Sequence, residues 1–498
     1  MADERYAFVV VSNRLPVDRV VADDGSASWT QSPGGLVTAL EPVMRQIEGA
    51  WVGWIGQPGD DLKPFTHNGL RIVPVALSEG EIESYYEGFS NDTIWPLYHD
   101  VIVPATYHRD WWDAYVEVNQ RFADNAASVA DTGATVWVQD YQLQLVPRML
   151  RLARPDLVIG FFNHIPFPAY GLYSQLPWRT QIIEGLLGAD VLGFQRVSDA
   201  GNFSRAARRL LGYTTRSPYV DVPATEGLPA RRVVARAFPI SIDVTAFEEL
   251  AHSPAVQARA KEIREELGNP KTVMLGVDRL DYTKGIGHRL KAFSELLAEG
   301  RLNVVDVTLV QVASPSRERV ETYKHLRDEI ELTVGRINGD FGTIGHQAVN
   351  YLHHGFPREE MAALYLASDV MLVTALRDGM NLVAKEYVAA RHDEDGVLVL
   401  SEFAGAADEL KTSLRINPHD IDGLKDAIMQ AVDMQRAERR KRMRSLRKRV
   451  RENDVGHWSR SFLRALSDAN GGIDRYGFDP DPLGDLEWTV ERPPSTSP

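Results

Sequence analysis

The segment "GVDRLDYTKG", residues 276–285, places Arg279 and Lys284 in one turn that follows an apolar stretch. Arginine supplies a rigid fork of N–H donors and lysine supplies a mobile point charge, so the two together suit a diphosphate group. Ion pairing with Asp278 or Asp281 is the structural alternative, because both carboxylates lie in the same segment. The spacing alone leaves both interpretations open.

A second turn with polar residues begins "TALRDGMNLVAKEYVAA", residues 374–390, and opens a helix that is apolar almost all round. Asn381 is the expected N-cap and Gly379 allows close approach of the backbone, so the free N–H groups of the next turn predict an anion site. Glu386 is then placed to accept hydrogen bonds from ribose hydroxyls. Lys385 and Glu386 lie about 100° apart on a helix and cannot simply pair with each other. Each of these charges must therefore reach solvent or a ligand.

A third glycine-containing turn is "SPGGLVTALEPVM", residues 32–44, in which Gly34 and Gly35 open a helical pattern. Glycine permits a tight turn, and it also permits a phosphate or a sugar to approach the backbone. Taken alone, the two glycines favour a tight turn.

The elements that carry these turns repeat one unit: a short apolar strand, a polar corner and then a helix. Examples in the first half are "YAFVVVSNRLP", "LVIGFFNHIPFP" and "ADVLGFQRVSDAGNFSRAARRLL", and examples in the second are "KTVMLGVDRLDYTKGIGHRLKAF" and "GVLVLSEFAGAADELK". Strands that are apolar on both faces and alternate with helices indicate parallel sheets covered on both sides. The sequence therefore predicts an α/β protein with two doubly wound domains that meet near residues 239–243.

Ligands of open parallel sheets bind beyond the carboxyl ends of the strands. The predicted corners at those ends carry polar side chains in both halves: Asn13, Arg14, Asp140, His164, Arg279, Lys284, Arg317, Asp378 and Glu386. Because so many share one structural position, we expect a ligand held between two facing domains.

Length and composition fit such a protein, with 498 residues of which 44% are hydrophobic. The absence of cysteine excludes disulfides, thiolate nucleophiles and cysteine-ligated metals. A net charge of −14 argues against general binding of nucleic acid. His346, His353 and His354 could share a helical face, but without nearby carboxylates we predict no zinc site. The basic segment 436–454 fits a solvated helix along one edge, and a partner-docking surface is the alternative.

Neither end of the chain predicts a membrane or export function. The N-terminal "MADERYAFVVVSN" fits a first strand better than a signal peptide, and no apolar stretch approaches the length of a membrane span. We expect a soluble cytoplasmic protein. Residues 471–498 are polar and proline-rich, and disorder is expected there.

Nine segments taken together resemble one family, the trehalose-6-phosphate synthases, which are retaining glycosyltransferases of family 20 with the two-domain GT-B fold. The segments are "VVVSNRLP", "PGGLVTAL", "WVGWIG", "SYYEGFSNDTIWPLYH", "FFNHIPFP", "LGFQ", "VDRLDYTKG", "RINGDFG" and "LRDGMNLVAKEYVAA", in the family's order from about residue 6 to 465. Each is weak alone, but the set is highly specific.

The resemblance implies four segments: an acceptor-binding Rossmann-like domain at 1–240, a nucleotide-sugar-binding Rossmann-like domain at 241–455, a C-terminal helix at 456–470 that could pack back on the first domain, and the tail. It also implies a reaction. The glucosyl group of a nucleoside-diphosphate glucose moves to O1 of glucose 6-phosphate, which gives α,α-trehalose 6-phosphate and nucleoside diphosphate.

The resemblance assigns the donor to a set of residues from both halves. Arg279 and Lys284 would hold the diphosphate. The remaining donor positions are Gly34, Gly35, Phe356 at the base, the backbone of Leu382, Val383, Ala384 and Lys385, and Glu386 at the ribose. Asp378 would bind hydroxyls of the transferring glucose, and with Arg279, Lys284 and His164 it would form the catalytic set.

The same resemblance implies an acceptor-binding site formed by Arg14, Tyr86, Asp140 and Arg317. Trp54, Trp95 and Ile165 would shape the sugar pocket and select the anomer. Nucleoside diphosphate is a good leaving group, so fixed positive charge could stabilise it. The resemblance thus implies no metal, no other cofactor and no protein nucleophile, and the expected partners are the two small substrates. Assembly into a homo-oligomer is compatible with the sequence.

One departure from the family pattern lies in "WVQDYQLQLVP", where Gln139 and Gln142 stand in place of the histidines of many members. Another GT-B transferase, such as a sucrose-phosphate synthase, a glycogen synthase or a phosphorylase, is the enzyme alternative. The non-enzyme alternative is a catalytically silent protein that senses a sugar phosphate.

Overall fold

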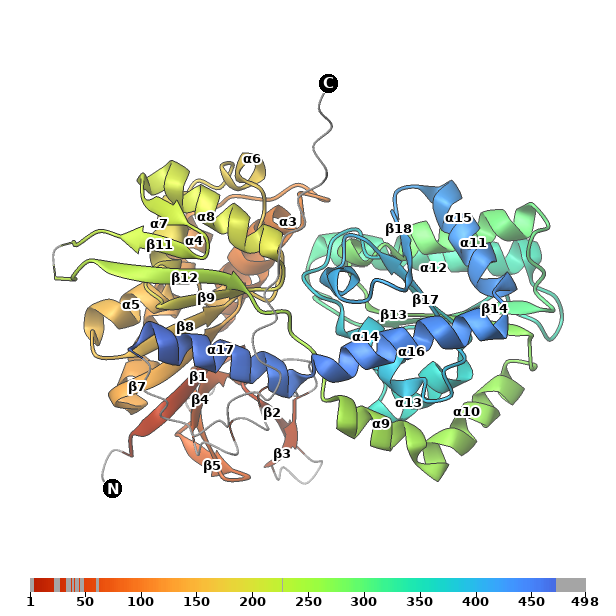
Figure 1. Cartoon of the computed structure of the whole chain (residues 1–498), viewed down its shortest axis with the longest axis horizontal. Coiled ribbons are helices and arrows are strands. Elements are labelled where there is room, and N and C mark those ends of the chain that lie inside the picture. The colour runs from red at the N-terminus through yellow and green to blue at the C-terminus, as the bar shows by residue number, and fades with distance from the viewer. Residues whose placement is uncertain are drawn as a thin grey trace.

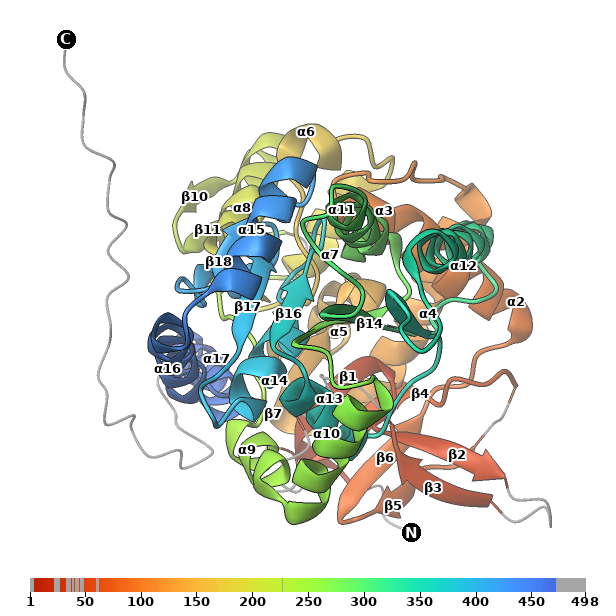
Figure 2. The same ribbon diagram turned by 90° about the vertical axis from the view of Figure 1, so that its right-hand side faces the viewer.

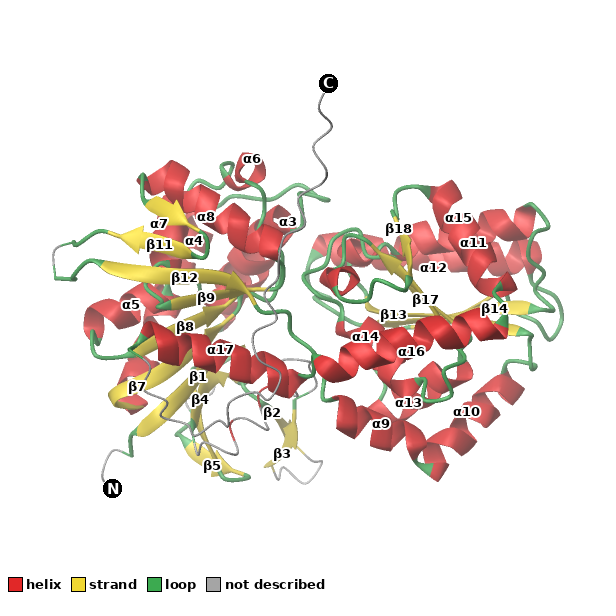
Figure 3. Ribbon diagram, viewed as in Figure 1, coloured by secondary structure: helices red, strands yellow, loops and turns green. Residues whose placement is uncertain are grey.

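Two sheets lie side by side along the long axis of the molecule, each between layers of helices (Figure 1; Figure 3). This computed structural model describes residues 4–21, 27–32, 37, 40, 44, 49–59, 62–225 and 227–471. We call the part built on the first sheet, up to residue 237, the N-terminal lobe, and the part from residue 244 to 452 the C-terminal lobe. The expected α/β class with two doubly wound parallel sheets is confirmed.

The sheet of the N-terminal lobe has ten strands in the order β10-β11-β12-β9-β8-β7-β1-β4-β6-β5, and the seven from β12 to β6 run parallel. Their bounds are β1 Tyr6–Arg14, β4 Ala50–Trp54, β5 Phe65–His67, β6 Leu70–Pro74, β7 Ala130–Gln139, β8 Val158–Phe162, β9 Val191–Phe194, β10 Thr214–Arg216, β11 Tyr219–Val222 and β12 Arg231–Ala237. A separate hairpin joins β2 (Val17–Val21) to β3 (Ala27–Gln31).

The helices of this lobe include an unusual π-helix, η1, over Ile82–Ile94. Helices with this hydrogen-bond pattern are rare and often occur at functional sites. The others are α2 Glu79–Glu81, α3 Trp95–Tyr98, α4 Arg109–Val129, η2 Tyr141–Leu143, α5 Val146–Ala153, α6 Tyr170–Tyr173, α7 Arg179–Leu186 and α8 Val197–Leu211.

The sheet of the C-terminal lobe has six parallel strands in the order β15-β14-β13-β16-β17-β18. Their bounds are β13 Thr272–Arg279, β14 Val307–Ser314, β15 Val349–Leu352, β16 Val370–Val373, β17 Val397–Ser401 and β18 Leu414–Ile416. The segment 349–352 is thus a strand, so the helical face expected for His346, His353 and His354 is wrong.

Helices cover both faces of this second sheet (Figure 2). One layer holds α11 Ile286–Ala298, α12 Glu321–Phe341 and α15 Ile421–Asp433. The other holds α9 Val244–His252, α10 Pro254–Glu266, α13 Arg358–Ala367, α14 Leu382–Ala390 and α16 Arg436–Glu452, and the short helices are η3 Tyr282–Lys284 and η4 Gly405–Asp408.

The last helix, α17 (Val455–Ala469), returns to the N-terminal lobe and lies across its sheet (Figure 1). Its Trp458 and Phe462 pack on Trp137 of β7 and Phe162 of β8, and the Phe462 and Trp137 rings are stacked 4.6 Å apart. One cluster of buried apolar side chains therefore extends through both lobes.

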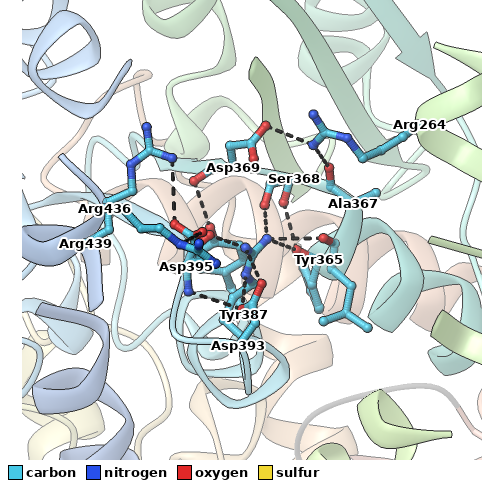
Figure 4. Close-up of polar contacts among 12 residues, drawn as sticks. Arg264, Tyr365, Ala367, Ser368, Asp369, Tyr387, Asp393, Asp395, Arg436 and Arg439 are labelled. Atoms are coloured by element: carbon cyan, nitrogen blue, oxygen red, sulfur yellow. Dashed lines mark hydrogen bonds and ion pairs between the residues drawn. The ribbon is translucent and has the colours of Figure 1, made fainter. Parts of the chain in front are cut away.

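The basic helix α16 is covered by carboxylates of its own lobe. Arg436 lies 2.9 Å from Asp395, Arg444 lies 2.8 Å from Glu394, and Arg447 lies 2.7 Å from Glu248. Figure 4 shows how Arg436 and Arg439 meet Asp395 beside the ends of α13 and α14. These ion pairs favour the interpretation of a solvated helix packed along one edge. In the part of the chain that the structure describes, no helix is long and apolar enough to cross a membrane.

Candidate active site

The two cations after β13 have different surroundings. Lys284 is buried, and its Nζ donates a 2.6 Å hydrogen bond to Oδ2 of Asp378, from the corner after β16. Arg279 is exposed, and no carboxylate of the described residues lies within ion-pair distance of it. The expected alternative, pairing with Asp278 or Asp281, is wrong, because Asp278 pairs with Arg289 and Asp281 with Arg317. The guanidinium of Arg279 is thus available to an anion.

Asp281 is the buried centre of a network that the sequence did not indicate. Its Oδ2 accepts hydrogen bonds from Arg317 (2.9 Å) and the Tyr323 hydroxyl (3.0 Å), and its Oδ1 accepts one from the N–H of Thr283 (2.9 Å). Burial opposes ionisation, yet Arg317, Arg279 and Lys284 hold the pKa of Asp281 well below its usual value. This carboxylate therefore holds Arg317 directly and lies within electrostatic reach of Arg279 and Lys284.

Trp95, the first residue of α3, lies over the same cations from the N-terminal lobe. Its ring is 3.9 Å from the Arg317 guanidinium and 5.5 Å from that of Arg279. Both distances suit cation–π attraction. Nη2 of Arg317 also donates to the hydroxyl of Tyr141 at 3.3 Å. Arg317, on the C-terminal lobe, is thus held by aromatic groups of the N-terminal lobe.

The corner after β16 forms a helix N-terminus as expected. Asn381 is the N-cap of α14, and its Oδ1 accepts from the N–H of Ala384 at 3.0 Å. Asn381 has a φ of 82°, in the left-handed region that Asn and Asp adopt more readily than other residues with a side chain. The N–H groups of Leu382 and Val383 have no acceptor inside the helix, and they could bind an anion.

Lys385 and Glu386 turn out to have separate partners. Lys385 is buried, forms an ion pair with Glu409 and donates a 2.8 Å hydrogen bond to the carbonyl of Ile240. Its side chain thus reaches neither solvent nor a ligand site, contrary to both alternatives. Glu386 is half-buried and accepts a 2.8 Å hydrogen bond from the Tyr365 hydroxyl, and burial raises its pKa.

Asp140 and His164 lie together at the ends of β7 and β8. The N–H of His164 donates to Oδ1 of Asp140 at 3.1 Å, and Nε2 of His164 lies 2.9 Å from Oε1 of Gln139. Burial lowers the pKa of His164 to about 3, so its imidazole is neutral at pH 7. Burial raises the pKa of Asp140 to about 6. Gln139 thus takes part in this pair, whereas Oε1 of Gln142 is buried and has no hydrogen-bond partner among the described residues.

The lobes touch closely at this point. A Cβ atom at Gly379 would lie 2.2 Å from the carbonyl oxygen of His164 and 3.1 Å from Cα of Ile165. Only glycine therefore permits this approach of the Asp378 corner to the N-terminal lobe.

Arg14, Trp54 and Tyr86 form a second group in the N-terminal lobe. The Arg14 guanidinium lies 5.4 Å from the Trp54 ring, and the Tyr86 ring meets the same indole edge-on at 5.6 Å. Arg14 also pairs with Asp18 at 2.7 Å. Burial disfavours the charge of Arg317, but Tyr323, Tyr141, Asp281 and Tyr86 raise its pKa, which places Tyr86 within its electrostatic reach.

Three expected donor residues lie outside these groups. Gly34 and Gly35 fall outside the described residues. Phe356 is half-buried, with its ring centroid 4.3 Å from that of His354, and no aromatic or polar contact joins it to the other candidates in the described ranges. Within those ranges, no three His, Asp or Glu residues gather as a metal site.

Comparison with known proteins gives the family. The model for glycosyltransferase family 20 matches residues 6–468. A trehalose-6-phosphate synthase of Mycolicibacterium gilvum is 58% identical over 469 residues, which cover 92% of this chain and 93% of the relative.

Solved structures agree in fold. An α,α-trehalose-phosphate synthase (UDP-forming) of Burkholderia xenovorans, in complex with glucose-6-phosphate, has a TM-score of 0.84 and 34% identity and covers 92% of this chain and 99% of its own. A protein of E. coli bound with UDP-2-fluoro glucose also has a TM-score of 0.84 and 34% identity, with coverages of 92% and 98%. Since the family model spans most of the chain, this protein belongs to glycosyltransferase family 20.

Proposed function

We propose that this protein transfers the glucosyl group of a nucleoside-diphosphate glucose to O1 of glucose 6-phosphate, with retention, and forms α,α-trehalose 6-phosphate. The observation that carries the proposal is that the Trp95 ring lies against one cation of the expected donor site and one of the expected acceptor site. Arg279 comes from the expected donor set, and Arg317 comes from the expected acceptor set. The relatives described above, one with glucose-6-phosphate and one with UDP-2-fluoro glucose, support the same pair of substrates.

The donor side supplies fixed positive charge for the leaving group. Arg279 and Lys284 would bind the diphosphate, with the N–H groups of Leu382 and Val383 at the start of α14. As the bond from C1 of glucose to the phosphate oxygen breaks, negative charge grows on that oxygen. Preorganised donors stabilise such charge without reorganising, and this stabilisation is the main chemical contribution that we assign to the protein.

The acceptor side orients a hydroxyl and anchors a phosphate. Arg14, Tyr86 and Arg317 would bind the 6-phosphate, and Asp140 would bind sugar hydroxyls. The acceptor O1 attacks C1 on the face that the phosphate leaves, and its proton passes to the departing phosphate oxygen. Because the phosphate accepts the proton, the neutral His164 is left to bind and orient the sugar.

The direct test incubates the purified protein with glucose 6-phosphate and UDP-, ADP- or GDP-glucose in turn. We expect release of nucleoside diphosphate together with trehalose 6-phosphate for at least one donor. Transfer to fructose 6-phosphate or to a glucan instead would favour another GT-B transferase. Saturable binding of glucose 6-phosphate without turnover of any donor would favour the sensor.

A pH profile tests the role of Asp140. Because the pKa of its carboxyl is raised to about 6, the group is ionised above that pH and protonated below it. The kcat/KM of the free enzyme for glucose 6-phosphate should therefore fall by about tenfold per pH unit below pH 6. The substrate phosphate also titrates near pH 6, so Asp140→Asn is the reference. The ratio of wild type to variant should be constant above pH 7 and should fall below pH 6. A ratio independent of pH would remove Asp140 as the ionising group.

Glu386→Gln tests the ribose contact. The Tyr365 hydroxyl can still donate to the amide oxygen, so the melting temperature should change little. Loss of a charged acceptor should weaken nucleoside diphosphate binding by about tenfold, the scale of one charge-assisted hydrogen bond. Isothermal titration calorimetry with the best nucleotide measures this, and an unchanged affinity would contradict the assignment.

A further inference from the structure

Arg377 lies between the lobes, one residue before Asp378, and the functions proposed above do not use it. Its Nε lies 3.1 Å from Oδ2 of Asp100, and its Nη2 lies 3.6 Å from Oδ1 of Asp199. Both carboxylates belong to the N-terminal lobe. The Arg377 side chain is 14% exposed and that of Asp199 is fully buried, whereas Asp100 is 44% exposed, so this ion cluster between the lobes is buried on its Asp199 side.

Asp199, near the start of α8, is the unusual member of this cluster. Its side chain is fully buried, yet neither carboxylate oxygen accepts a well-aligned hydrogen bond among the described residues. A buried charge without such partners is costly unless a counter-ion lies close. Arg377 is the only cation within ion-pair distance of this carboxylate in the described part of the chain. The ionised carboxylate of Asp199 is therefore stabilised most by Arg377 of the C-terminal lobe, with smaller contributions from Arg196 and the backbone of Phe167.

Asp100 connects the cluster to the sugar pocket. It follows α3, whose first residue is Trp95, and the intervening His99 packs against the Trp95 ring in a tilted arrangement, with the ring centroids 4.1 Å apart. Asp100 and Val101 both have positive φ, 58° and 56°, a conformation that is strained for the β-branched Val101. Such strain persists only when surrounding contacts fix the backbone. The pair with Arg377 is one such contact.

The backbone of Arg377 is tied to the donor side. The N–H groups of Leu376 and Arg377 both point to the carbonyl of Thr283, at 2.7 and 3.4 Å, next to Lys284. Asp378 then accepts from Lys284, and Gly379 meets the His164 carbonyl. A shift of Arg377 would therefore move Asp378 and Gly379 with it.

We propose that Arg377 is a positioning residue: its ion cluster with Asp100 and Asp199 holds the lobes closed so that Asp378 and Trp95 face the same substrate. The cluster contacts no reacting atom. It fixes the placement of the expected phosphate ligands Arg279 and Lys284, which lie on the C-terminal lobe, relative to the acceptor pocket. This inference rests on the proposed function only through the turnover assay.

The test compares Arg377→Gln, Asp199→Asn and the double variant with the wild type. We expect Arg377→Gln to lower kcat by about 10²-fold, the cost of misplacing reacting groups by about 1 Å. Affinity for nucleoside diphosphate should stay within about threefold, because Arg279, Lys284 and the start of α14 remain together on the C-terminal lobe. Small-angle X-ray scattering with saturating nucleoside diphosphate should show a larger radius of gyration. The double variant should be no slower than Arg377→Gln alone, because the two residues act as one unit.

A second ion pair between the lobes provides the matched control. Arg196 donates two hydrogen bonds to Asp408, at 2.7 and 2.8 Å, but its partner is 53% exposed. Asp408→Asn breaks this pair but keeps the charge of Arg196, which also acts on Asp199. This variant should leave kcat within about threefold, as an exposed pair contributes little. A kcat for Arg377→Gln within threefold of wild type, or an equal loss in Asp408→Asn, would overturn the proposal.

Folding and function are separated by two further readouts. If Arg377→Gln is unstable by its melting temperature, the isosteric Asp199→Asn decides, with an expected fall in kcat of about tenfold, less than for Arg377→Gln because Asp100 still pairs with Arg377. If the wild type itself transfers no glucosyl group, the proposed function fails. Scattering then still decides the present inference, because an unchanged radius of gyration in both variants would overturn it.

Discussion

Arg279→Ala should lower the turnover number by about 10² to 10³, the range measured when one preorganised donor to a developing oxyanion is removed. Arg279 is exposed at the end of β13, and no described carboxylate pairs with it. The folded protein therefore loses no ion pair in this variant, and the melting temperature should stay near that of the wild type. Initial-rate measurements of nucleoside diphosphate release, with both substrates saturating, give the number.

Two variants serve as controls for this result. Arg279→Lys keeps the charge but loses the planar fork, so its rate should lie between those of wild type and alanine variant. Arg301→Ala removes an arginine that pairs with Asp426 on the surface and should leave the rate unchanged. A rate for Arg279→Ala near that of the wild type would contradict its assignment to the leaving group.

Lys284→Ala removes the second cation expected to bind the diphosphate, but it is a less specific test than Arg279→Ala. Lys284 pairs with Asp378, and although burial opposes ionisation, the charge of Lys284 helps to hold the pKa of Asp378 below its usual value. Removing the lysine would also leave that carboxylate buried without its cation. A loss of rate would then combine a missing phosphate ligand with a displaced Asp378.

The sequence predicts the parts of this site that depend on strand order. Arg279 ends the buried strand β13, and Asp140 and Asp378 follow β7 and β16, so the alternation of strands and helices was enough to place each at the carboxyl end of its own sheet. The N-cap Asn381 follows equally from local chemistry, since a short polar side chain before an apolar helix satisfies a free N–H.

Other parts of the site depend on contacts between segments far apart in the chain. Asp281 and Arg317 are 36 residues apart, and Lys385 and Ile240 are 145 apart. No local pattern selects one arginine among many as the partner of a given carboxylate. The π-helix η1, with 13 residues, is another part that the sequence did not predict. Packing of Tyr85 and Phe89 into the core accompanies that geometry.

Lys385→Met should lower the free energy of unfolding by about 3 to 5 kcal/mol, the cost of leaving one charge of a buried pair alone. The side chains of Lys385 and Glu409 are 1% and 4% exposed, so water cannot replace the lost partner. Lys385 also donates to the carbonyl of Ile240, where the chain passes between the lobes. Urea denaturation followed by circular dichroism and by tryptophan fluorescence measures the loss and shows whether the two lobes unfold together.

The double variant Lys385→Met, Glu409→Met decides between a structural lysine and a ligand lysine. Replacing both charges with apolar side chains removes the buried unpaired carboxylate, so most of the lost stability should return. Turnover and nucleotide affinity should return with it, since the Lys385 side chain is directed to Glu409 and Ile240. A stable double variant with weak nucleotide binding would instead mean that Lys385 contacts the donor. The charge on this apolar helix would then contribute to substrate binding, and the ion pair with Glu409 would describe only the protein without its ligand.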